Sequence, residues 1–143
     1  MLRVEPEILT NYVAKGLVSL AFSPATDFGK PSQLATQAAE CAGKQNPMAF
    51  WKMHDLLFQQ QDQLWNADSD VMVQFAKGLG LDTEALDSCL GDPDIVAKIT
   101  RRVEERNALG IRSRPSFSVN GKIIAGSLPY PAFAKVLDEA LKR

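Results

Sequence analysis

A block of helical apolar spacing over residues 31–110, set between two short stretches of β-type pattern, constrains this chain most. Before the block, Leu17 to Phe22 is an almost continuous apolar run, which predicts a buried strand. After it, residues 116–119 and 122–125 are short β-type runs joined by Asn120-Gly121. Asn-Gly between two such runs is a strong hairpin signal, because both turn residues need a positive φ. The order of helix, strand, helices, hairpin and helix predicts an α/β protein.

Start and stop signals divide the helical regions. Asp68, Asp82 and Asp92 precede apolar periodic segments and are typical N-caps, and Pro93 suits a first helical turn. The opening and closing helices each carry one apolar face, with these residues: Ile8, Leu9, Tyr12 and Val13 in the first, and Phe133, Val136, Leu137 and Leu141 in the last. Gly16 suits the end of the opening helix.

Composition and charge exclude several classes of function. Sixteen basic residues against seventeen acidic ones give a net charge of −1, which does not indicate a nucleic-acid partner. The chain has no apolar run near the ~18 residues of a membrane span, and its first residues do not form a signal peptide. One His and two Cys leave little for a metal site, so we expect no metal and no cofactor. His54 is interpreted as a structural residue of an amphipathic helix.

Several strings of residues carry a resemblance that covers nearly the whole chain. They are Pro6–Val18, Ala38–Ala42, Phe50–Phe58, Gly110–Lys122 and Gly126–Phe133. With these residues in this order, the chain resembles the DsbA-like branch of the thioredoxin superfamily. The resemblance implies a thioredoxin-like fold in one domain, 1–143. Its core would comprise 1–30 and 111–143, a helical insertion would span 31–110, and the first, central strand of the family would be missing.

The resemblance also implies a parent activity, namely thiol–disulfide exchange with protein or peptide substrates that carry thiols. The family performs it with a Cys-x-x-Cys motif, and this sequence has none. We therefore expect no catalytic residue and no redox activity in this chain as written. The alternatives are a non-catalytic peptide-binding or chaperone-like module, or a fragment of a longer oxidoreductase. Relatives imply a periplasmic or extracytoplasmic setting, whereas the absence of a signal peptide indicates a cytoplasmic one.

Cys41 and Cys89 are the only thiols, and the residues themselves leave three alternatives. They are a redox pair, two free buried cysteines, or a structural disulfide. Both lie on apolar faces of predicted helices, where nothing obvious lowers a thiol pKa. The resemblance favours the structural disulfide, since paired cysteines at similar places brace the helical insertion in some relatives.

Arg114 and Pro115 are the predicted substrate-binding residues. By resemblance, the proline is cis and the residue before it presents its backbone to a bound peptide. The alternative for Arg114 is a loop arginine in solvent. The missing strand would leave open edges on the strands predicted at 17–22 and 116–119, and such edges invite pairing with another chain. We therefore expect a homodimer or a larger assembly through the open sheet edge.

Overall fold

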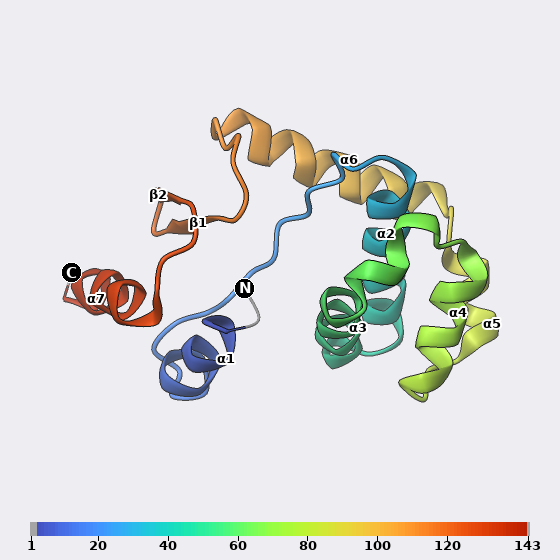
Figure 1. Cartoon of the computed structure of the whole chain (residues 1–143), viewed down its shortest axis with the longest axis horizontal. Helices are drawn as coiled ribbons and strands as arrows, with labels where there is room; N and C mark the ends of the chain where they lie inside the picture. Colours follow the sequence, from blue (N-terminus) through green and yellow to red (C-terminus); the bar gives the residue numbers. More distant parts are fainter. Residues whose placement is uncertain (1–2, 143) are drawn as a thin grey trace. The chain divides into compact units, whose positions relative to one another are not determined.

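The computed structural model describes residues 3–142 (Figure 1). Its contacts divide the chain into two compact units. The central unit is Ser23–Glu105, and the terminal unit combines Met1–Phe22 with Arg106–Arg143. The predicted division, with an insertion over 31–110, stays a prediction.

The central unit is helical. It contains the helices α2 (Lys30–Gln45), α3 (Pro47–Gln59), α4 (Ser69–Gly78), α5 (Thr83–Cys89) and most of α6 (Pro93–Ala108), with the 3₁₀ helix η2 (Gln61–Asn66) after α3. The predicted caps are confirmed. Asp68 accepts the N–H of Val71 at 3.2 Å, and Asp82 accepts that of Ala85 at 2.9 Å. Asp92 caps α6 in the same way, so local polar side chains decide where these helices begin.

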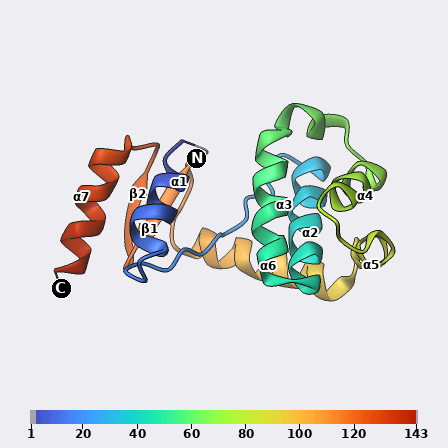
Figure 2. The same cartoon turned by 90° about the horizontal axis from the view of Figure 1, so that it is seen from below.

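The core of the central unit depends on the close approach of α2 and α3, which run side by side (Figure 2). Small residues on α2, such as Ala38 and Ala42, are buried in this core. A Cβ added at Gly43 would lie 3.1 Å from the Cβ of Phe50, so the glycine permits the approach. The buried hydrophobic cluster also includes Met53, Leu57, Met72, Ala76, Leu86, Ile95 and Ile99.

None of the helices in the described part of the chain is long and apolar enough to cross a membrane. The longest two, α2 and α6, have 16 residues each. At 1.5 Å per residue they reach about 24 Å, which is shorter than the ~30 Å hydrocarbon layer of a bilayer.

The terminal unit contains the helix α1 (Glu5–Ile8), which continues as a π-helix η1 (Leu9–Val13), then the strands β1 (Ser116–Val119) and β2 (Lys122–Ala125), and the helix α7 (Tyr130–Leu141). The strands pair antiparallel, with Val119 opposite Lys122. Asn120 and Gly121 have φ of 48° and 85°. The predicted hairpin is confirmed, and both turn residues adopt the positive φ that this type of turn needs.

Four buried side chains form the core of the terminal unit: Ile8, Tyr12, Phe133 and Leu137. They join the opening helix to α7, and Phe117 of β1 adds a ring at 4.6 Å from that of Phe133. The sheet therefore packs on this core through the aromatic pair and through Val119.

The prediction of a strand over Leu17–Phe22 is wrong. Residues 18–22 have no regular secondary structure, and the sheet in the described part of the chain has only β1 and β2. Exposure still alternates along this segment, with residues 18, 20 and 22 half-buried and 17, 19 and 21 exposed. The apolar pattern thus marks one covered face, but a strand also needs a neighbour for its backbone hydrogen bonds. No described residue supplies one to residues 18–21.

Candidate functional site

A tight turn over residues 113–116, here named the Pro115 turn, leads directly into β1. Its Arg114–Pro115 peptide bond is cis, as predicted. The Ser116 hydroxyl donates to the carbonyl of Ser113 at 2.6 Å, and the two hydroxyl oxygens lie 3.3 Å apart. These contacts close the turn across its base and hold Arg114, which is exposed, and Pro115, which is half-buried, at its tip.

The Pro115 turn is fixed to the hairpin. The N–H of Gly126 donates to the carbonyl of Pro115 at 2.9 Å, which extends the ladder by one pair beyond Ser116 and Ala125. Hydrogen-bonded and non-hydrogen-bonded pairs alternate in an antiparallel ladder. Since Pro115 belongs to a hydrogen-bonded pair, Phe117 and Val119 do too.

The same alternation determines which backbone groups of β1 point away from β2. They are the N–H and C=O of Ser116 and Ser118, which we name the outer edge of β1. No hydrogen bond joins these groups to another described residue. The outer edge is therefore a short row of backbone donors and acceptors, and the Pro115 turn lies at its start. Such an edge can pair with an extended chain.

The structure places the two predicted pairs of site residues in different units. Arg114 and Pro115 lie in the terminal unit, and Cys41 and Cys89 lie in the central unit. The substrate-binding role of Arg114 and Pro115 stays a prediction. Ser113, Ser116 and the outer edge could not be identified from the sequence, because two serines around a proline carry no signal until the pairing of the strands is known.

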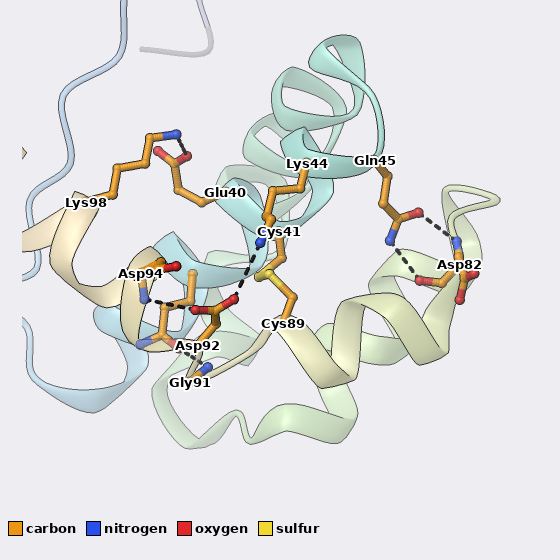
Figure 3. The surroundings of a disulfide bond; sticks show 11 residues. Glu40, Cys41, Lys44, Gln45, Asp82, Cys89, Gly91, Asp92, Asp94 and Lys98 are labelled. Carbon is orange, nitrogen blue, oxygen red and sulfur yellow. Dashed lines mark hydrogen bonds and ion pairs between the residues drawn. A yellow bond between two sulfur atoms is a disulfide. The ribbon is translucent and has the colours of Figure 1, made fainter.

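Cys41 of α2 and Cys89 of α5 form a disulfide, with their Cα atoms 5.8 Å apart (Figure 3). Of the three alternatives for these cysteines, the structure contains this one. Cys41 is buried at 1% exposure, and Cys89 is half-buried. The bond joins residues 48 positions apart and so ties α5 to the centre of the unit.

Polar contacts on both sides of the disulfide reinforce this tie. Gln37 and Gln45 are each four residues from Cys41, so all three lie on one face of α2. The Gln45 side-chain amide donates to the carbonyl of Asp82 at 2.8 Å and accepts its N–H at 2.9 Å. Gln37 accepts the N–H of Gly91 at 2.9 Å. One face of α2 thus holds both ends of α5.

Asp92 connects this region to α6 (Figure 3). Its carboxylate accepts the N–H of Asp94 at 2.9 Å and approaches the Lys44 Nζ at 3.4 Å. The pKa of Asp92 is lowered, chiefly by the backbone hydrogen bond from Asp94; burial opposes this, and the hydrogen bond and charge of Lys44 lower the pKa further. Asp92 therefore stays ionised where it caps the helix.

His54 lies inside the central unit, at 3% exposure, among aromatic rings. Its ring centroid is 4.8 Å from that of Phe58 and 5.5 Å from that of Trp51. Its Nδ1 lies 3.1 Å from the Asp55 Oδ1. Within the central unit, His54 therefore makes the contacts of a packed core side chain.

Tyr12 has a polar role that its apolar periodicity did not reveal. Its hydroxyl donates to the Asp138 Oδ1 at 2.8 Å. That hydrogen bond is the main cause that raises the pKa of Tyr12 to about 12, with burial and the Asp138 charge adding to it. Asn11 likewise donates to the Tyr130 hydroxyl at 2.8 Å. The partners lie more than a hundred positions apart, so local spacing carries no signal for them.

A family model identifies the family of the chain, and a solved structure identifies its fold. The sequence model of the family described as thioredoxin matches residues 2–139. The crystal structure of oxidised BdbD from Bacillus subtilis superposes with a TM-score of 0.88 at 24% identity. The match covers 99% of this chain and 78% of that one, and it shows that the two share a fold.

Two kinds of curated relatives are similar in sequence. Disulfide bond formation protein D of Bacillus subtilis is 26% identical over 141 residues, which are 96% of this chain and 63% of that protein. The Na(+)/H(+) antiporter NhaA 3 of Salinispora tropica is 34% identical over 116 residues, which are 81% of this chain and 17% of the antiporter. NhaA 1 of Salinispora arenicola gives a similar match. The chain thus spans under two thirds of the Bacillus relative and about a sixth of the antiporters.

Proposed function

Because the chain belongs to the thioredoxin family, we propose that it binds extended polypeptides along the outer edge of β1, beside the Pro115 turn. Its polypeptide partners carry cysteine thiols, as suits a relative of a disulfide bond formation protein. The single observation that carries the proposal is the row of backbone groups at Ser116 and Ser118 that point away from β2.

Strand addition explains how such an edge holds its partner. An extended chain that pairs with β1 receives main-chain hydrogen bonds that do not depend on its sequence. The Pro115 turn stands at the entrance of this edge, so Arg114 and Pro115 would contact the residue of the partner that lies beyond the last backbone pair. Phe117 and Val119, whose side chains lie on the opposite face from Ser116 and Ser118, pack against the core of the terminal unit.

Proline substitutions test the edge, because proline removes one N–H. Ser118→Pro removes an outward N–H and leaves the hydrogen bonds to β2 intact, so we expect loss of binding to a fluorescent, cysteine-containing peptide. Ser118→Ala keeps the N–H and should bind like the original chain. Circular dichroism verifies that both variants fold. Unchanged affinity in a folded Ser118→Pro chain would refute binding at this edge.

We further propose that these 143 residues do not catalyse thiol–disulfide exchange by themselves. Exchange needs a reactive thiolate, and the two thiols of this chain are bonded to each other, with Cys41 buried. In an insulin-reduction assay with dithiothreitol, we expect the rate of dithiothreitol alone. A faster rate that disappears in Cys41→Ser would assign redox chemistry to this pair and overturn the proposal.

The outer edge of β1 is equally suited to pair with the same edge of a second copy of the chain. Edge-to-edge pairing would give a homodimer, or a larger assembly, by the same hydrogen bonds. Sedimentation at micromolar concentration measures this. We expect association that Ser118→Pro abolishes; a monomer at all concentrations would leave the edge to peptides alone.

A further inference from the structure

The charges of the chain divide sharply between its two units. The terminal unit has nine basic and four acidic residues, a net charge of +5. The central unit has seven basic and thirteen acidic residues, a net charge of −6. The overall charge of −1 therefore conceals a basic unit, and that unit contains the outer edge of β1.

The Pro115 turn lies in a stretch of the terminal unit that has no acidic residue. Residues 106–137 contain five cationic side chains and no carboxylate. Two of the cations, Arg112 and Arg114, are exposed and flank Ser113 at the entrance of β1. The four carboxylates of the unit lie on the helices, as Glu5 and Glu7 in α1, and Asp138 and Glu139 in α7. Asp138 already accepts the hydroxyl of Tyr12.

From this distribution we infer that the proposed polypeptide site selects acidic segments, with Arg112 and Arg114 as the residues that set the preference. The inference rests on the proposed function, because strand pairing supplies the affinity and the arginines supply the selection. Backbone pairing does not distinguish one extended chain from another, whereas guanidinium groups form charge-assisted hydrogen bonds with carboxylates. Salt screens charges beyond about 8 Å at physiological ionic strength, so the cations nearest the edge dominate.

Two peptides separate selection from binding. Both carry one cysteine and the same alternating apolar centre; one has glutamates on either side of this centre and the other has lysines. We expect the glutamate peptide to bind the full chain about tenfold more tightly at 50 mM salt, since each exposed charge pair strengthens binding only a few-fold. At 500 mM salt the ratio should fall to about twofold or less.

Variants locate the preference. Arg112→Gln with Arg114→Gln should bring the ratio of the two affinities close to one while the lysine peptide still binds. Lys135→Gln removes an exposed cation from α7 and should leave the ratio unchanged. Equal effects of the arginine pair and of Lys135 would assign the preference to net charge and overturn the role of the two arginines.

The possible failures can be told apart. If both peptides bind equally well to the original chain, the inference fails and the proposed function stands. If neither peptide binds, the proposed function itself fails. A single-stranded oligonucleotide of the same charge cannot pair with a strand, so we expect it not to displace the glutamate peptide. Displacement at comparable concentration would identify a general anion site and overturn the selection of acidic polypeptides.

Discussion

The two units of this chain differ in the size of their buried cores and in how fully their backbone groups are paired. The central unit buries twelve hydrophobic side chains in one cluster and adds a disulfide with polar contacts on both sides of it. The terminal unit buries four and supports a two-stranded sheet whose outer edge has no partner among the described residues. We therefore expect the central unit to be the more stable one. The terminal unit carries the unpaired backbone groups of the outer edge.

The chain carries a separate optical probe for each unit. Trp51 and Trp65 lie in the central unit, and Tyr12 and Tyr130 lie in the terminal unit. Tryptophan fluorescence thus reports on one and the tyrosine signal on the other. Units with different local stability open at different free energies, so the comparison can be measured in one sample.

The largest effect should come from the disulfide. Replacing Cys41 and Cys89 with serine removes a closure of 48 positions. Chain entropy gives a loss of about 4 kcal/mol in the free energy of unfolding. Denaturant titration followed by tryptophan fluorescence measures it, and the original chain with a reducing agent is the control. An equal loss in the tyrosine signal would mean that the two units unfold as one, which would end the comparison.

Two glycines of the central unit test its close packing. Gly43→Ala places a Cβ 3.1 Å from Phe50, whose own Cβ cannot swing aside, so we expect a loss of about 1 kcal/mol. Gly78→Ala is the matched control: it lies in α4 with nothing within 4 Å, and it should gain about 1 kcal/mol. Thermal denaturation of both variants compares them. If Gly43→Ala stabilises as much as Gly78→Ala, the contact between α2 and α3 is looser than described.

The hydrogen bond from Tyr12 to Asp138 should make the terminal unit sensitive to alkali. The pKa of Tyr12 is raised to about 12 in the folded chain, above the ordinary value of 10.0. The stabilisation is therefore complete below pH 10 and is lost as the pH rises from 10 to 12. Absorbance at 295 nm in a Tyr130→Phe chain follows Tyr12 alone. Asp138→Ala should lower the midpoint, while Glu139→Ala should not; equal shifts would show a general charge effect.

The smallest effect should come from Asp92. Its pKa is lowered, so its contribution is present above the ordinary carboxyl pKa and is lost as the pH falls through the folded value. The backbone N–H of Asp94 is the larger cause. Asp92→Ala should therefore destabilise the central unit more than Lys44→Ala does, as read by tryptophan fluorescence at pH 7. The reverse order would make the ion pair, rather than the cap, the important contact.

Local signals were sufficient for much of the fold. The caps at Asp68 and Asp82 and the Asn120-Gly121 turn were predictable, because each depends on neighbours within a few residues. The strand over residues 17–22 was not, since its apolar run shows which side chains are covered but not whether a strand lies beside it.

The candidate site was predictable only in part. The resemblance identified Arg114 and Pro115, but the outward direction of the Ser116 and Ser118 backbone follows from the ladder register. The contact between Tyr12 and Asp138 joins residues 126 positions apart, which no local pattern relates. Residues that are joined only by tertiary pairing were therefore the ones that sequence reasoning missed.

Amide hydrogen exchange along β1 tests the open edge most directly. In the chain alone, we expect the N–H groups of Phe117 and Val119 to exchange slowly, since they face β2, and that of Ser118 to exchange fast. Addition of the glutamate peptide should slow Ser118 and leave Phe117 and Val119 unchanged. Slow exchange at Ser118 at a dilution where the chain is monomeric, and without peptide, would contradict the account, because the outer edge would then already be paired.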